Sequence, residues 1–239
     1  MTDRADGIDL VEALRTTGAV REFADRPVGH DVLARVLDNA RFAPNGGNQQ
    51  AWRVILVEDP ALRRAVRDLY VPGWREYLEQ RLDGIQPWAP IGDRAAEGRA
   101  IERAAAQPRD DGEPAPGDFA ANFHRVPVMA VILADLRLLA ATDRDLGRYT
   151  LVGGASIYPF VWSILLAAHA EGLGGVLTTM TVVREAAMKD LLAIPEEQAV
   201  VAVLALGYPL EPRPTRLRRG PVESFTTIDT FDGDPLAGP

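Results

Sequence analysis

The sequence predicts a single α+β domain, in the broad sense an α/β fold, in which helices flank a central mixed sheet. Two features carry this prediction. Short apolar runs rich in valine, isoleucine and leucine recur along the chain, and segments with the spacing of amphipathic helices separate them. Such alternation is typical of a sheet that is covered by helices. At 239 residues the chain is long enough to enclose one large core.

The expected strands are the apolar segments 52–58, 126–135, 174–180 and 199–209. They are bounded by charged residues, glycine or proline, which interrupt regular structure. Helical spacing is found in residues 8–16, 30–42 and 182–194, and a further helix is expected from Ala61 onward. Pro44 ends the second of these helices, and the turn Asp59-Pro60 precedes the third.

A long apolar helix is expected over residues 149–170, which include no Asp, Glu, Lys or Arg. The segment is long enough to cross a bilayer, but it stands alone and contains Gly153, Gly154 and Pro159. A helix that is apolar on all sides can equally be the centre of a large core or of a subunit interface. We therefore expect no membrane span here.

Composition excludes several classes of function. The net charge of −8 argues against binding to nucleic acid or to an anionic membrane. The absence of cysteine excludes disulfides, thiolate metal sites and cysteine nucleophiles. The three histidines are scattered, so no metal site is expected. The first ten residues are acidic and polar, unlike a signal peptide, which makes a cytoplasmic location the expectation.

Residues 84–125 are predicted to be an insert in the domain, with five prolines and five glycines. One helix is expected within it, from Arg94 to Ala106. Segments of this kind form active-site lids or disordered loops. A lid is favoured because aromatic residues gather around the insert in the sequence. Those expected to contact substrate are Tyr70, Trp74, Tyr77, Trp88 and Phe123.

Three polar features stand out. Arg21 follows the first helix, the amide-rich loop 44–50 precedes the first strand, and the run RPTRLRR (213–219) follows the last strand. Arginine side chains match phosphate geometry, so the run indicates an anionic ligand, or else a solvated basic turn. Phosphate-loop, dinucleotide-binding and Gly-x-Ser-x-Gly motifs are absent from the sequence.

The order of these features resembles the FMN-dependent nitroreductase family. The sequence APNGGNQQAWR (43–53) is similar to the family pattern Ala-Pro-Ser-x-x-Asn-x-Gln-Pro-Trp, from which only Asn45 and Ala51 depart. The apolar segment that ends in Ala167-Ala168 and Gly172-Leu173-Gly174 adds to the likeness. The resemblance covers nearly all of the chain apart from the insert.

The resemblance implies a homodimer with FMN at two interfacial sites and NADH or NADPH as the electron donor. The loop from Pro44 would approach the flavin from one subunit, and arginines of the other would hold its phosphate. A C-terminal strap over about 210–239 would extend onto the partner. The residues expected at the cofactor are Arg21, Pro44, Asn45, Gly46, Asn48, Gln50, Leu177, Thr178, Thr179, Arg216, Arg218 and Arg219.

By the same resemblance the flavin passes electrons to a small acceptor (a nitroaromatic compound, a quinone or a biosynthetic intermediate) by a ping-pong mechanism. Thr17 and Ala19 stand where the family commonly has the arginine and serine of Arg-x-Ser-x-Arg, so that only Arg21 of that motif remains. Two alternatives stay open. The chain is either a specialised dehydrogenase, dehalogenase or flavin-consuming enzyme, or a non-catalytic flavin-binding protein.

Overall fold

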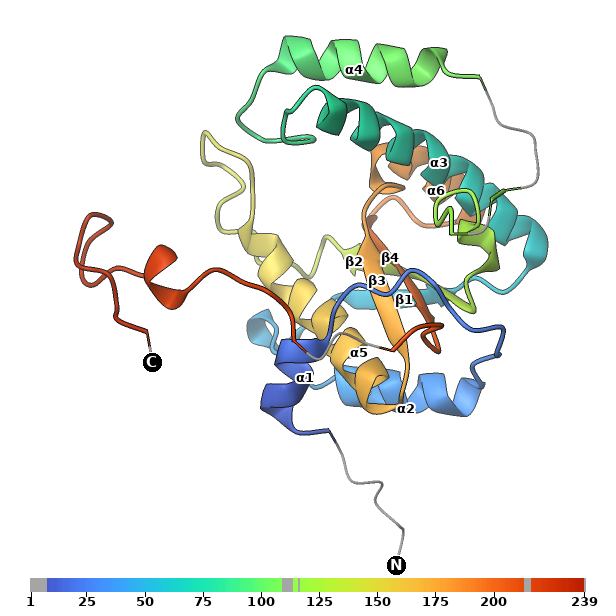
Figure 1. Cartoon of the computed structure of the whole chain (residues 1–239), viewed down its shortest axis with the longest axis horizontal. Coiled ribbons are helices and arrows are strands. Elements are labelled where there is room, and N and C mark those ends of the chain that lie inside the picture. Colours follow the sequence, from blue (N-terminus) through green and yellow to red (C-terminus); the bar gives the residue numbers. More distant parts are fainter. Residues whose placement is uncertain (1–7, 109–113, 116, 213–215, 239) are drawn as a thin grey trace, which may run out of the picture.

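One four-stranded sheet forms the centre of the molecule. The computed structural model describes residues 8–108, 114–115, 117–212 and 216–238. The strands lie in the order β1 (Trp52–Leu56), β2 (Val128–Asp135), β4 (Gln198–Gly207) and β3 (Gly174–Thr178) (Figure 1). Neighbouring strands are antiparallel throughout. Among the described residues, the parallel pairing of a mixed sheet is limited to one bridge between Ala19 and Gly175.

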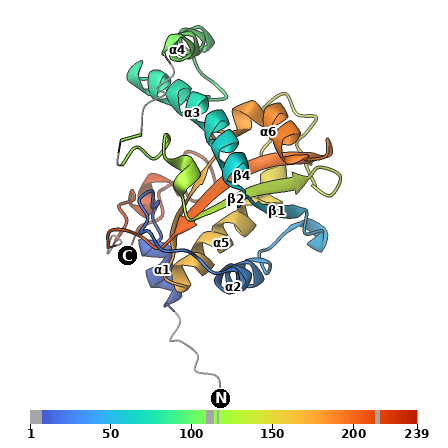
Figure 2. The same ribbon diagram turned by 90° about the vertical axis from the view of Figure 1, so that its right-hand side faces the viewer.

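Helices cover both faces of this sheet. The helices α2 (His30–Ala40) and α5 (Tyr158–Ala170) lie on one face, and α3 (Pro60–Leu82) and α6 (Glu185–Leu192) lie on the other (Figure 2). Successive side chains of a strand point to opposite faces, so a strand covered on both sides is apolar throughout. Accordingly every residue of β2 is buried. Val131 packs on the α3 side, and Ile132 packs on the α5 side.

Aspartates set the start of three helices. The helices α1 (Leu10–Thr16), α3 and α4 (Arg94–Ala106) each follow an aspartate whose carboxylate accepts two backbone N–H groups. These residues are Asp9, Asp59 and Asp93. Such N-caps satisfy donors that the first turn of a helix leaves without a partner. The helix expected within the insert therefore occurs, with the expected bounds.

The long helix expected over residues 149–170 is shorter in the structure. Val152–Ser156 forms a 3₁₀ turn, and α5 begins only at Tyr158. Buried Asp143 accounts for the difference, because its carboxylate accepts hydrogen bonds from the N–H groups of Leu151 (2.7 Å) and Val152 (3.3 Å). Of the described helices, the stretch 152–170 is the one long and apolar enough to span a membrane by composition. Within it, Phe160, Val161 and Ile164 belong to the core.

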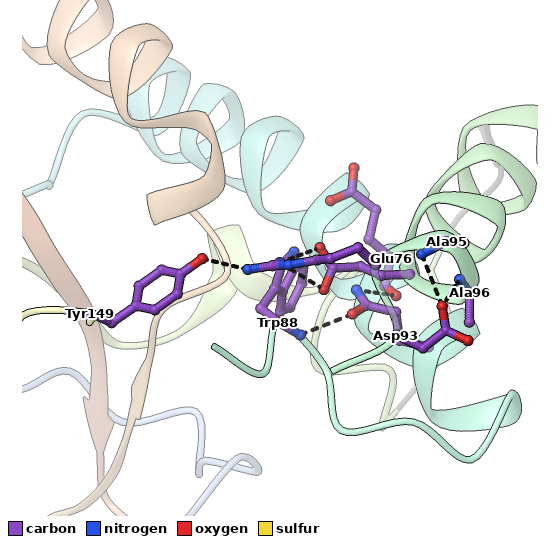
Figure 3. Close-up of polar contacts among 9 residues, drawn as sticks. Glu76, Trp88, Asp93, Ala95, Ala96 and Tyr149 are labelled. Atoms are coloured by element: carbon purple, nitrogen blue, oxygen red, sulfur yellow. Dashed lines mark hydrogen bonds and ion pairs between the residues drawn. The ribbon is translucent and has the colours of Figure 1, made fainter. Parts of the chain in front are cut away.

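The insert packs against α3. Three alanines of α4 are buried, namely Ala96, Ala100 and Ala104. Two polar contacts also join the insert to α3. Arg103 of α4 pairs with Glu79 at 3.0 Å, and the backbone N–H of Trp88 donates to the side chain of Gln80 at 2.9 Å. At the start of α4, Arg94 donates to the hydroxyl of Tyr149, which belongs to the segment before α5 (Figure 3). Residues 84–106 thus form a layer outside α3, whereas Phe123, near the end of the insert, is buried in the core.

Two glycine substitutions test the packing at the edge strand β3. A Cβ on Gly175 would lie 2.4 Å from Cδ2 of Leu206 and 2.7 Å from the backbone oxygen of Ala205. We expect Gly175→Ala to lower the free energy of unfolding by about 1–3 kcal/mol, the usual cost of overpacking a core. Urea unfolding measures this change.

Gly98→Ala is the matched control. A Cβ on Gly98 meets nothing within 4 Å, and Gly98 lies inside α4. Helix propensity alone then predicts that Gly98→Ala raises the free energy of unfolding by about 0.5–1 kcal/mol. Equal effects of the two substitutions would contradict the close packing inferred at β3.

Candidate functional site

Four arginines line a cavity of about 620 Å³ between α1, α5 and the edge of β3. They are Arg15, Arg21, Arg216 and Arg219, and we call this space the arginine cavity. Its apolar wall includes Trp162 and Leu177, and no described residue that lines it is acidic. In a protein with a net charge of −8, such a concentration of positive charge suits an anionic ligand.

Backbone pairing at β3 positions Arg21. After α1 ends, the chain turns at Gly18, and Ala19 forms its bridge with Gly175. The N–H of Val20 then donates to the carbonyl of Gly175 at 2.9 Å. This pairing runs along the free edge of β3 and delivers Arg21 to the cavity.

The C-terminal arginines reach the same place through a second backbone contact. The N–H of Leu217 donates to the carbonyl of Arg15 at 2.8 Å, which fixes the segment after residue 216 against α1. Arg216 and Arg219 line the cavity, whereas Arg218 does not. Arg213, the first arginine of the run, lies outside the described residues.

Arg15 is a site residue that the sequence did not indicate. It occupies the last turn of α1, where an arginine is commonly explained by the helix dipole. The one available signal was its position two residues before Thr17, where the family motif departs from its pattern. The structure therefore supplies a fourth cation close to the position of the missing one.

Leu177 and Thr178 face opposite sides of the sheet. Leu177 lines the arginine cavity, while the hydroxyl of Thr178 lies 3.3 Å from that of Tyr70, on the α3 side. Thr179 is half-buried, and its carbonyl accepts from the N–H of Val182. Of the three residues expected at the flavin ring, only Leu177 is brought to the cavity.

Tyr70 connects this strand to the aromatic residues. Its ring stacks on Phe123 at 4.2 Å, and both residues are buried in the core. Trp74 stacks on Tyr77 at 5.3 Å, whereas Trp88 is fixed separately through its backbone. Burial raises the pKa of the Tyr70 phenol, against the opposing effects of the Thr178 hydrogen bond and the positive charge of Arg21. Tyr70 is therefore a neutral hydroxyl beneath β3.

The amide loop, residues 44–50, lies apart from the arginine cavity. The side chain of Asn45 folds it by accepting from the N–H of Gln50 at 2.8 Å. The N–H of Gly46 donates to the hydroxyl of Ser156 at 3.0 Å, just before α5. Pro44, Gly46, Asn48 and Gln50 are exposed, and Asn48 and Gln50 adopt positive φ. Within one chain, the structure brings together the arginines and Leu177 but not this loop.

A larger cavity of about 980 Å³ shares Arg21 with the arginine cavity. It lies between residues 21–27, the start of α3 and the end of the insert. Acidic and basic side chains both line it, so its charge does not favour an anion. Among the described residues, no group of three or more histidine, aspartate or glutamate side chains is placed to hold a metal ion.

Comparison with known proteins identifies the chain. The model of the nitroreductase family matches residues 14–208. The chain belongs to the nitroreductase family. This confirms the resemblance seen in the sequence, and with it the expectation of an oxidoreductase with a nitroreductase-like α+β fold.

Curated members of the family share about a quarter of their residues with this chain. An NADH dehydrogenase of Thermus thermophilus is 26% identical over 85% of this chain and 88% of its own length. A 5,6-dimethylbenzimidazole synthase of Rhodospirillum rubrum is 27% identical over 87% of this chain and 85% of its own length. A nitrobenzene nitroreductase of Ectopseudomonas oleovorans is 25% identical over 91% of this chain and 95% of its own length. The family thus includes relatives with different named activities at similar identity.

Solved structures show the same fold. An FMN- and NADPH-dependent nitroreductase from Sphigopyxis sp. strain HMH superposes with a TM-score of 0.62 at 24% identity, covering 94% of this chain and 100% of that one. An iodotyrosine deiodinase bound to FMN and 3-iodo-L-tyrosine superposes with a TM-score of 0.61 at 22% identity. The match covers 92% of this chain and 100% of the deiodinase chain.

The hydrogen bond between Thr178 and Tyr70 gives a testable expectation. Tyr70→Phe leaves the buried hydroxyl of Thr178 without its partner, so the free energy of unfolding should fall by about 1–2 kcal/mol. Tyr77→Phe is the control, because the Tyr77 ring stacks on Trp74 and no described residue hydrogen-bonds its hydroxyl. Chemical denaturation of both variants checks this, and an equal loss in the two would contradict it.

Proposed function

We propose that this nitroreductase-family protein is an FMN-dependent oxidoreductase that uses NADH or NADPH to reduce a small organic acceptor. The acceptor is a nitroaromatic compound, a quinone or a biosynthetic intermediate. The observation that carries the proposal is the arginine cavity, in which four arginines meet an apolar wall at the edge of β3. FMN combines the same two chemistries, a phosphate and a flat ring.

The residues present fit this cofactor. Arg15, Arg216 and Arg219 would hold the phosphate dianion, with charge-assisted hydrogen bonds that no nearby carboxylate competes for. Leu177 and Trp162 offer apolar surface to the rest of the molecule. The volume of about 620 Å³ lies within the range of roughly 300–1,000 Å³ that is common for small-molecule sites.

FMN supplies the redox chemistry when bound, taking two electrons from NADH or NADPH and passing them to a second substrate, so that donor and acceptor use the site in turn. Arg21, which lines the cavity, would contribute a positive charge that stabilises negative charge on the bound ring. The neutral hydroxyl of Tyr70 holds Thr178 from behind and thereby fixes the end of β3.

A second copy of the chain would complete the site. The amide loop is exposed and lies outside the arginine cavity of its own chain, as expected if it serves the cavity of a partner. On α5, Tyr158 and Trp162 are 48% and 39% exposed, which is high for the apolar central helix of a domain. The C-terminal segment 216–238 extends away from the domain (Figure 1). Its Phe225 and Phe231 are 70% and 94% exposed, as suits a strap on a partner subunit.

Two other functions are compatible with the fold. A specialised enzyme is one of them, since 5,6-dimethylbenzimidazole synthases match the chain at 27–28% identity, close to the identities of the dehydrogenase and nitroreductase relatives. The departures at Thr17 and Ala19 favour a flavin-binding protein without turnover.

The absorbance spectrum of purified protein, followed by anaerobic titration with NADH and NADPH, separates the three functions. A general reductase is yellow and bleaches quickly, a specialist bleaches slowly with both donors, and absence of bound flavin at saturating FMN contradicts the proposal.

Substitutions in the arginine cavity test the phosphate site. Arg219→Ala and Arg21→Ala should each weaken FMN binding about ten- to a hundredfold, because a charge-assisted contact contributes roughly 1.5–3 kcal/mol. Arg15→Ala should do the same. Arg21→Ala should in addition slow reduction of the flavin. Fluorescence titration of apo-protein with FMN measures each dissociation constant.

Arg218→Ala is the control, since it removes the same charge from the same run but does not line the cavity. Its effect on FMN affinity should be less than threefold. Equal, small losses in all four variants would mean that the run is a solvated turn and that the phosphate is held elsewhere.

The strap gives a separate prediction. Phe225→Ser combined with Phe231→Ser should raise the dissociation constant of the dimer at least tenfold, because two exposed aromatic side chains lose their apolar contact with the partner. Ile91→Ser, at an equally exposed site in the insert, should have no such effect. Sedimentation across a range of concentrations measures both. A monomeric wild-type protein at micromolar concentration would contradict the dimer.

A further inference from the structure

Thr17 and His169 form a hydrogen-bonded pair at the edge of the arginine cavity. Thr17 follows the last residue of α1 and lines the cavity. Its Oγ1 lies 2.7 Å from Nδ1 of His169, in the last turn of α5. His169 is only 7% exposed, so α1 and α5 hold its ring in place. The hydroxyl of a residue that lines the cavity is thus held by a buried imidazole.

The position of the proton between Thr17 and His169 decides whether the Thr17 hydroxyl can bind an anion. A threonine hydroxyl has one proton, and a ring nitrogen of histidine is either a donor or an acceptor. If Thr17 donates to Nδ1, the hydroxyl presents only lone pairs to the cavity, and these repel an anion. If Nδ1–H donates to Oγ1, the hydroxyl proton remains available for an anionic oxygen. An anion in contact with Thr17 therefore requires the proton on Nδ1.

We propose that His169 is a positioning residue for the anionic end of the ligand. Its Nδ1–H holds Oγ1 of Thr17, and Thr17 donates its hydroxyl proton to a phosphate oxygen. This inference rests on the proposed function, in which FMN brings the phosphate to the arginine cavity. The pair supplies a donor at Thr17, where the chain departs from the arginine of the family pattern. His169 acts through Thr17 and need not touch the ligand.

The neighbouring residue provides a contrast. The hydroxyl of Thr16 donates to the carbonyl of Glu12 at 2.7 Å, within α1. Thr16 is buried and does not line the cavity. Two adjacent threonines therefore have different partners, which makes Thr16 the matched control for Thr17.

Binding of FMN and of riboflavin, which lacks the phosphate, is the first test. Thr17→Val should weaken FMN binding about tenfold, the usual effect of removing a hydrogen bond to a charged group, and leave riboflavin binding unchanged. Thr17→Ser should keep FMN affinity, and Thr16→Val should not alter it. His169→Phe should cause the same loss as Thr17→Val, and the double variant should lose no more. Unchanged FMN affinity of Thr17→Val would overturn the proposal.

The second test uses wild-type protein and does not depend on the variants folding. Nitrogen-15 NMR of the histidine rings distinguishes a protonated from an unprotonated Nδ1. Titration of flavin-free protein with inorganic phosphate should populate the protonated Nδ1 of His169. A ring whose Nδ1 stays unprotonated at saturating phosphate or FMN would overturn the proposal.

The two tests separate this proposal from the proposed function. A wild-type protein that binds no FMN contradicts the flavin enzyme, yet the phosphate titration still decides whether Thr17 and His169 bind an anion. A protein that binds FMN with the same affinity after Thr17→Val contradicts the pair and leaves the flavin site intact.

Discussion

The close approach of the N-terminal segment to the edge of β3 is the constraint on which the site depends. Gly174 makes it possible, because a Cβ at this position would lie 2.6 Å from Cγ2 of Val20. With the segment paired at this edge, α1 is fixed beside α5, and the C-terminal segment binds in turn to the carbonyl of Arg15. Arginines from both ends of the chain thereby meet in one cavity. A side chain on Gly174 would push the N-terminal segment, and Arg21 with it, away from this edge.

The sheet has no open face to offer the proposed partner subunit. Both of its faces are covered within one chain, so the strands have no apolar surface left to offer. The helix α5 differs, because Ile164 fills the core while Trp162, two residues earlier, lies partly exposed beside the arginine cavity. One helix thus contributes both to the core and to the wall of the site. An apolar surface at that position is covered either by a flat ligand or by a second copy.

Much of the fold could be predicted from the sequence because the deciding interactions are local. Continuous apolar runs predicted the strands, and helical spacing of apolar residues predicted helices such as α2. The start of α5 could not be predicted, since it depends on the buried carboxylate of Asp143 eight residues before Leu151. For the site, alternation along β3 was available and separates Leu177 from Thr178. Arg15 was missed because its role requires Leu217, a contact between the two ends of the chain.

The charges of the cavity argue for an anion independently of any family. Several arginines elsewhere are paired with acids, as with Arg35 and Glu171 at 2.9 Å, or Arg148 and Asp143 at 2.8 Å. The four arginines of the cavity form no ion pair with any described residue, although acidic residues outnumber basic ones by 34 to 26 in the whole chain. Like charges held together without a counter-charge repel one another, and here backbone hydrogen bonds such as that of Leu217 oppose the repulsion. A bound phosphate would relieve that repulsion, so the proposed cofactor would stabilise the segment that binds it. The same phosphate would then link both ends of the chain to β3.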